Sequence, residues 1–341
     1  MFSLLPRQQY EFPDIHVKRP AVRAGSWIVN TTKLNKNYLD MNKILEFCYF
    51  SICEDFGRPM RLLRLIDEHP NMSVQLTEPN PVVAVSNVVK WQNWGMQPIN
   101  NWPCHKRGTL LGWKQSAERY SSFYAHRPEF ENFGRCEVLD QWNCDIQDVT
   151  GLSSSKSNLE TFSSLDSMVK TNSKEMIDEI TEYKLKKNLS HREIRILNGE
   201  GDYFARYRWD GRTFLINSGG SHHFAAARYI ASRINRPVPL NGKLYTYSIN
   251  RLALDSLLCD FDIYAISDET DISIGFHNAM RTFRATYLWQ HLPCPYTHAR
   301  AILLPKNEER SMRVSRVLRT SGMFNIGEHL VALTDRQACF A

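Results

Sequence analysis

The chain of 341 residues is 43% hydrophobic, 23% charged and 11% aromatic, and its formal net charge is +6. These values are ordinary for globular proteins and exclude a collagen-like, coiled-coil or wholly disordered chain. The length predicts about two domains and is sufficient to bury a core without disulfides or metal ions.

No stretch approaches the roughly 18 uncharged apolar residues of a membrane-spanning helix, and Arg7 and Gln8 interrupt the apolar N-terminus. We therefore expect a soluble, cytoplasmic protein without a membrane partner. A surplus of six positive charges is small for a dedicated nucleic-acid domain.

The cysteines are scattered and form no Cys-x-x-Cys motif, which predicts reduced, packed thiols. The best local zinc candidate comprises His291, Cys294 and His298, but the prolines within it favour a rigid connecting loop. We therefore expect no metal site. The eight cysteines are Cys48, Cys53, Cys104, Cys136, Cys144, Cys259, Cys294 and Cys339.

Residues 1–150 are predicted to form a tryptophan-rich N-terminal region of unassigned fold. Six of the eight tryptophans precede residue 143. We interpret the tryptophans of residues 91–102 as core, the alternative being a surface that stacks bases or a partner. Hydrophobic periodicity and β-branched runs predict a short strand at 27–30, a helix over 41–56, and strands at 74–76 and 82–89.

Residues 151–173 contain eight serines and few large apolar side chains, a composition that predicts a flexible linker. A second domain is predicted over residues 174–341. It opens with a helix capped by Ser173, followed by strands at 193–197, 203–209 and 213–217. Asp210-Gly211 lies between the last two strands and predicts a hairpin turn.

The rest of the chain alternates helices and strands, so the predicted fold class is α/β. Arg310, Arg313 and Arg316 recur at three-residue intervals in a basic helix. We interpret that helix as a solvated amphipathic one, the alternative being a face that follows a phosphate backbone. The predicted elements are a helix at 222–234, a strand at 243–247, a helix from 251, a strand at 261–266, a helix at 278–288, a strand at 301–304, the basic helix at 308–318 and a strand at 329–333.

One segment is typical of a binding site. Gly219, Gly220, Ser221, His222 and His223 end a predicted strand and begin an alanine-rich helix. The first amides of a helix lack internal partners, and the helix dipole favours an anion there. The glycines allow close approach, while the serine and histidines can hydrogen-bond the ligand. The segment predicts a phosphate-binding loop. The alternative is a tight strand-to-helix turn with Ser221 as its cap.

The order strand, Gly-Gly-Ser-His-His-Phe-Ala-Ala, helix resembles the signature of the ParB/sulfiredoxin-like superfamily. In that superfamily the strand ends in Gly-Glu-Arg-Arg-x-Arg-Ala-Ala or Gly-Gly-Cys-His-Arg-Tyr-Ala-Ala. The resemblance covers about residues 172–250. It implies an α/β domain with a mixed sheet, whose loop binds nucleotide phosphates at a helix N-terminus.

The departures from that signature change the expected chemistry. Ser221 stands where sulfiredoxins place the attacking cysteine, so sulfinic-acid reductase activity is not expected. His223 stands where the superfamily's arginine grips phosphate, and an imidazole cannot reproduce that bidentate fork. Ser218 stands where a kinase branch has an aspartate.

The sequence thus predicts a protein that binds the phosphate of a nucleotide or nucleic acid, and a nucleotide with Mg is the cofactor candidate. One alternative is a nucleotide-dependent kinase or phosphohydrolase on the same loop. It requires a nearby carboxylate, for which Asp178, Glu179, Glu182 and Asp202 are candidates. Another alternative is a non-enzymatic interaction protein that works through the tryptophan-rich region. A hydrolase based on neighbouring Ser221 and His222 is disfavoured, because no Gly-x-Ser-x-Gly elbow occurs.

Overall fold

The computed structural model describes residues 31–76, 80–95, 107–199 and 201–339. The chain divides into two units, residues 1–48 and 49–341. The described part of the first unit is helical and belongs to α1 (Thr31–Asp55), which confirms the helix predicted over 41–56. The strand predicted at 27–30 lies outside the described residues. Within the described ranges, no helix is both long and apolar enough to cross a membrane.

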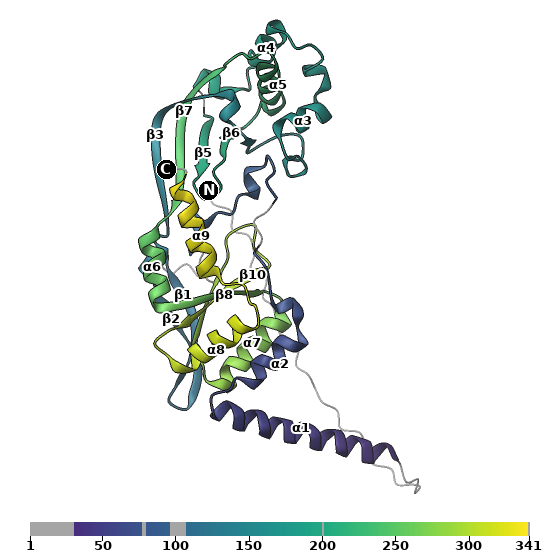
Figure 1. The fold of residues 1–341 in the computed structure, drawn as a ribbon, viewed down its shortest axis with the longest axis vertical. Coiled ribbons are helices and arrows are strands. Elements are labelled where there is room, and N and C mark those ends of the chain that lie inside the picture. Colours follow the sequence, from purple (N-terminus) through teal and green to yellow (C-terminus); the bar gives the residue numbers. More distant parts are fainter. Residues whose placement is uncertain (1–30, 77–79, 96–106, 200, 340–341) are drawn as a thin grey trace, which may run out of the picture. The chain divides into compact units, whose positions relative to one another are not determined.

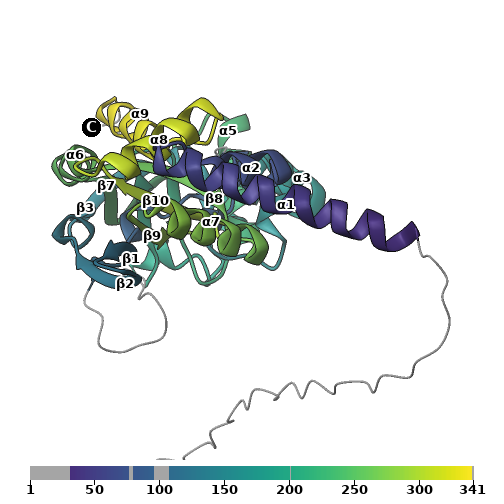
Figure 2. The same cartoon turned by 90° about the horizontal axis from the view of Figure 1, so that it is seen from below.

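The first sheet of the larger unit has five strands in the order β2-β1-β9-β10-β8, and every pair is antiparallel. Every residue of β8 is buried. Since successive side chains of a strand point to opposite sides, both faces of β8 are covered. Tyr264 and Ile266 face α7 and α8, whereas Ile263 and Ala265 face α6 and α9. Figure 2 shows α7 and α8 beside this sheet. The strands are β1 (Thr109–Ser116), β2 (Arg119–His126), β8 (Phe261–Ser267), β9 (Tyr287–His291) and β10 (Ala299–Pro305).

The helices packed around the first sheet carry apolar residues at helical spacing, which bury one face of each. In α9, for example, Ile326, Leu330 and Leu333 are buried. These helices are α2 (Met60–Glu68), α6 (Arg251–Asp260), α7 (Thr270–Phe283), α8 (Glu309–Thr320) and α9 (Ile326–Ala338).

The second sheet is mixed, with the order β3-β7-β5-β6-β4. The β3–β7 and β5–β6 pairs are antiparallel, and the β5–β7 and β4–β6 pairs are parallel. Helix α5 connects β6 to β7, and α3 and α4 pack against it (Figure 1). The elements are β3 (Gly134–Asp145), β4 (Gly151–Leu152), α3 (Leu165–Asn172), α4 (Glu182–Leu189), β5 (Tyr203–Tyr207), β6 (Thr213–Ile216), α5 (Ser221–Arg233) and β7 (Pro239–Ile249).

The predicted α/β class is confirmed, and the local signals around the candidate loop are accurate. Strands β5 and β6 pair as the predicted hairpin, and the amides of Asp210 and Gly211 turn the chain by donating to Tyr207 O. Helix α5 begins one residue before the predicted start. Its alanines pack in the second core, where their small side chains let the helix approach the sheet.

The serine-rich stretch 151–173 is folded and is not a linker. It contributes β4, which pairs with β6, and the whole of α3. Leu159, Leu165, Met168 and Val169 are buried in the second core. Together with the buried Leu152 of β4, these residues anchor the stretch, and its serine hydroxyls bond to neighbouring backbone and side chains.

The predicted division into residues 1–150 and 174–341 does not describe how the sheets are built. Strand β1 pairs with β9, and β3 pairs with β7, so both sheets combine strands from the two predicted parts. Trp91 and Trp94 are only 1% exposed and form part of the core. Their burial confirms the core interpretation for these two residues; Trp102 lies outside the described residues.

Several predicted strands are wrong. Residues 74–76 have no regular structure and follow an isolated bridge at Ser73, while residues 82–89 make one isolated bridge at Ala84 and a short 3-10 turn. Residues 195–198 form another 3-10 turn. Residues 329–333 belong to α9. A short apolar run fits the two-residue period of a strand as well as the period of a helix, and the buried residues that flank this run recur at helical spacing. The helix predicted from Ser173 is a 3-10 turn there, and α4 begins only after its cap Thr181. The helix predicted at 278–288 ends earlier, and the chain continues as β9.

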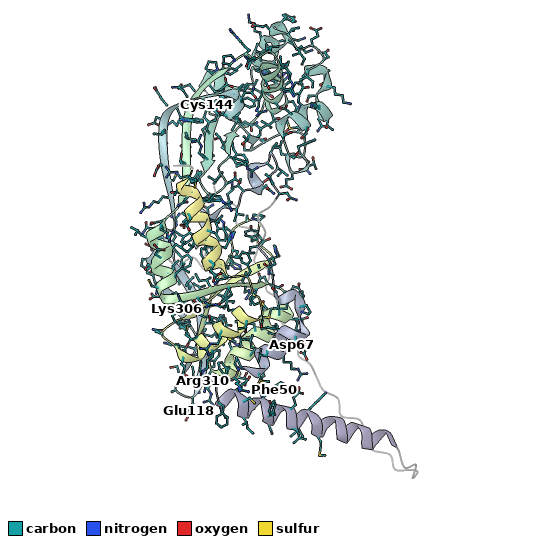
Figure 3. All side chains as sticks on the ribbon, in the orientation of Figure 1. Phe50, Asp67, Glu118, Cys144, Lys306 and Arg310 are labelled. Atoms are coloured by element: carbon teal, nitrogen blue, oxygen red, sulfur yellow. The ribbon has the colours of Figure 1, made fainter. Side chains whose placement is uncertain are left out.

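The basic helix α8 is confirmed, and most of its arginines are engaged within the protein. Arg310 Nη1 donates to Phe283 O at 2.6 Å, and Arg313 pairs with Glu309. Arg310 and Lys306 are labelled in Figure 3, and Lys306 Nζ lies 3.4 Å from Asp262 Oδ1. Cations already satisfied by protein groups favour the structural interpretation of this helix.

Candidate functional site

The predicted loop residues all line one cavity of about 670 Å³. We call residues 218–223 the α5 loop. The opposite wall is formed by residues 153–157, which we call the serine loop, and by parts of the segments around α3 and residues 191–193. The lining residues are Ser154, Ser155, Lys156, Ser157, Asn172, Met176, His191, Glu193, Ser218, Gly219, Gly220, Ser221, His222 and His223. A volume of this size is within the range of small-molecule sites, about 300–1,000 Å³.

Gly220 determines how the α5 loop enters its helix. Its φ of +69° lies in the left-handed region, which favours glycine. An alanine Cβ at this position would lie 2.7 Å from the carbonyl carbon and oxygen of Glu193. The α5 loop therefore rests directly on the backbone of the neighbouring segment, and only glycine allows that approach.

Asn217, at the end of β6, joins the two loops. Its Oδ1 accepts from the amides of Ser153 and Ser154 at 3.2 Å. Its Nδ2 donates to Ser154 O at 3.0 Å and to Gly219 O at 2.9 Å. Ser221 Oγ adds a bond to Ser155 Oγ at 3.0 Å. The side chain of Asn217 is buried, so these bonds hold the serine loop against the start of α5.

The first turn of α5 presents amides to the cavity. The N–H groups of Ser221, His222 and His223 donate no backbone hydrogen bond within the described residues. They lie at the positive end of the helix dipole. Lys156, whose side chain is exposed, also lines the cavity. Amides without a backbone partner at a helix N-terminus can donate to an anion.

His222 is held between two serines. Its Nδ1 lies 2.5 Å from Ser173 Oγ, and its Nε2 lies 3.1 Å from Ser157 Oγ. Burial lowers the pKa of His222, the nearby Lys156 lowers it further, and Glu175 opposes both. His222 is therefore a neutral imidazole near pH 7, able to accept a proton.

His223 is directed to a different wall. Its ring stacks on His191 with the centroids 3.8 Å apart, and its Nδ1 lies 3.0 Å from Asn188 Oδ1. Burial lowers the pKa of His223, and the adjacent imidazoles lower it further, against the carboxylates of Glu193 and Glu175. The two neighbouring histidines thus have separate partners and separate surroundings.

The carboxylate required by the kinase or phosphohydrolase alternative lies close to the α5 loop. Asp202 Oδ1 accepts from the amide of Ser218 at 3.2 Å, and burial raises the pKa of Asp202. Glu193 lines the cavity beside Gly219. Asp178 is exposed and pairs with Lys184, and Glu182 lies near Arg236. Glu179 is likewise exposed. Of the four predicted acids, only Asp202 contacts the loop.

Sequence reasoning missed the serine loop, Ser173 as a histidine partner, and Glu193. The run Ser-Ser-Ser-Lys-Ser at residues 153–157 offered a signal, because a lysine among hydroxyl side chains is a phosphate-binding composition. The serine content of this run instead predicted a flexible linker. Nowhere in the described ranges do three His, Cys, Asp or Glu side chains gather as a metal site.

Comparison with known proteins identifies one family. The model of DUF6685, described as a family of unknown function, matches residues 139–340, which include both loops of the cavity. No curated protein matches the chain. No solved structure matches it.

Proposed function

The chain belongs to the DUF6685 family of unknown function, and from the geometry of its cavity we propose that it binds a phosphate ester, namely a nucleotide or the end of a nucleic acid. One observation carries the proposal. Residues 221–223, whose amides donate no backbone hydrogen bond in the described part of the chain, line the same cavity as Lys156. The resemblance of the α5 loop to the ParB/sulfiredoxin-like superfamily is part of the same proposal.

The composition of the cavity favours a nucleotide over inorganic phosphate. The cavity of about 670 Å³ is far larger than a phosphate group. Glu193 places negative charge in the cavity lining beside Gly219, which disfavours a second anion and suits the hydroxyl groups of a sugar or the amino group of a base. Lys156, Ser154 and Ser155 suit the phosphate itself. A nucleoside phosphate satisfies both ends.

A binding experiment tests this proposal. Thermal shift with inorganic phosphate and nucleoside phosphates, and fluorescence anisotropy with a labelled single-stranded oligonucleotide, measure the interaction directly. Lys156→Gln should weaken binding about tenfold or more, since a charge-assisted hydrogen bond contributes about 1.5–3 kcal/mol. Lys187→Gln is the matched control, because Lys187 is exposed on α4 and does not line the cavity. Absence of binding to every probe would refute the proposal.

A nucleotide-dependent kinase or phosphohydrolase remains the second candidate. It is favoured by the bond between Asp202 and the Ser218 amide, since a carboxylate beside a phosphate loop can act as an acid or base. A Mg²⁺ ion would enter with the nucleotide. Release of inorganic phosphate from a nucleoside triphosphate, and its loss in Asp202→Asn, would support this candidate.

A further inference from the structure

Three side chains form a continuous line that begins at the cavity, which Ser157 and His222 line, and ends at the buried Ser173. Ser173 Oγ lies 2.5 Å from His222 Nδ1, and His222 Nε2 lies 3.1 Å from Ser157 Oγ. The three residues come from three segments: the end of α3, the start of α5 and the serine loop. A hydroxyl, an imidazole and a third group that orients the ring are the elements of an activated serine nucleophile.

The neighbouring hydrogen bonds leave the Ser157 proton available for donation to His222. Asn172 Nδ2 donates to Ser157 Oγ at 2.7 Å, so this oxygen accepts there and its own hydrogen remains to be donated. His222 Nε2 accepts that hydrogen when the ring carries its proton on Nδ1. In this tautomer Ser173 Oγ accepts from Nδ1–H. Ser173 is fully buried, which fixes the orientation of its hydroxyl and of the ring.

The same cavity wall supplies stabilisation for an anionic transition state. Ser157 follows Lys156 directly and lines the cavity together with the start of α5. Negative charge that develops on the oxygens of an attacked phosphorus would face the α5 amides and the Lys156 ammonium. The reacting hydroxyl, its base and the anion donors therefore share one site.

We propose that Ser157 is a nucleophile toward phosphodiesters, with His222 as its general base and Ser173 as a positioning residue. This inference rests on the proposed binding of phosphate esters. Ser157 Oγ attacks phosphorus and its proton moves to His222 Nε2. A P–O bond to Ser157 forms, the bond to the leaving oxygen breaks, and His222 returns the proton to that oxygen. Water then attacks phosphorus and gives a proton to His222, the P–O bond to Ser157 breaks, and His222 returns that proton to Ser157 Oγ.

Diesters are the phosphate class that this arrangement suits. Phosphoryl transfer from the terminal phosphate of a nucleotide passes through a loose transition state, in which the attacking group needs little assistance from a base. Displacement at a diester gains more from a deprotonated nucleophile and from protonation of the departing alkoxide. A neutral imidazole hydrogen-bonded to the nucleophile supplies both.

The test incubates the full chain with bis(p-nitrophenyl) phosphate, a phosphodiester whose cleavage releases coloured nitrophenol. The expected results are a burst of nitrophenol and a covalent adduct that intact-mass and peptide spectra place on Ser157. Ser157→Ala should lose the adduct, and His222→Gln should form it at least about a hundredfold more slowly. Ser232→Ala is the matched control, an exposed serine on the same helix whose loss should change nothing. Circular dichroism confirms that each variant is folded.

Ser173 requires a readout that a purely structural role would not move. Ser173→Ala should slow adduct formation, lower the pH midpoint of the reaction because the imidazolium loses an acceptor, and shift the His222 ring ¹⁵N signals away from the Nδ1–H tautomer. An unchanged midpoint and tautomer would overturn the role of Ser173.

The binding and labelling experiments separate the two proposals. If the wild-type protein binds the oligonucleotide but forms no adduct, or forms it on another serine, the nucleophile proposal is overturned and phosphate binding stands. If the protein binds none of the phosphate probes, both proposals fail.

Discussion

Replacing Gly220 by alanine tests whether the cavity depends on direct contact between the α5 loop and the backbone at Glu193. A left-handed conformation costs a non-glycine residue about 1–2 kcal/mol. The added Cβ would also lie 2.7 Å from the Glu193 carbonyl and 2.9 Å from the amide nitrogen of Ile194. Forcing the two segments apart adds about 1–3 kcal/mol, as in overpacked cores. We expect Gly220→Ala to lower the free energy of unfolding by about 2–5 kcal/mol.

Gly322→Ala isolates the contribution of the contact. Gly322 has a similar φ of +73°, but an added Cβ there would meet no atom of the protein within 4 Å. This variant should lose only the conformational part, about 1–2 kcal/mol. Urea denaturation of both variants, combined with oligonucleotide anisotropy, measures the difference. Equal losses of stability in the two variants would refute the argument that the α5 loop is held by close approach.

Three further predictions concern the same unit. Burial lowers the pKa of His222 and His223, so the unfolded chain binds more protons than the native state just below pH 6.5, and stability should fall as the pH drops through that range. Thermal melts at several pH values should show a smaller fall in the double variant His222→Gln, His223→Gln. An identical fall in the variant would contradict the linkage. Asn217→Ala removes the bonds that join the two loops and should cost about 2–4 kcal/mol in denaturant titrations, whereas Asn241→Ala, at an exposed position on β7, should cost little. Trp94→Ala removes a buried indole that packs edge-on against two phenylalanine rings, and it should lower the free energy of unfolding by about 3–5 kcal/mol. A stability close to that of the wild type would mean that this tryptophan is not part of the core.

Local signals predicted the elements that carry the α5 loop. The Asp210-Gly211 turn between two apolar runs specifies a hairpin, and two glycines before an alanine-rich stretch specify a strand-to-helix turn. Short apolar runs were less informative. Residues 329–333 fit a strand until the whole of α9 is considered, and residues 82–89 have β-branched composition but make only one bridge to β4.

Composition was misleading in the serine loop. Residues 153–157 have the content of a flexible linker, but Asn217 holds their backbone against β6 and α5. Whether a polar stretch is mobile depends on the partners that its hydroxyl and amide groups find, and those partners lie more than sixty positions along the chain. No pattern within the stretch encodes them.

The sequence alone therefore determined the class of the fold, the hairpin and the glycine-rich start of α5, because each follows from backbone preferences within a few residues. Only the tertiary structure decided that the α5 loop faces Lys156, and that His222 lies between Ser157 and Ser173. Ser157 and His222 are 65 positions apart. The distance of 3.1 Å between Ser157 Oγ and His222 Nε2 results from the packing of α3, α5 and β4 around the second core. No local rule specifies that packing.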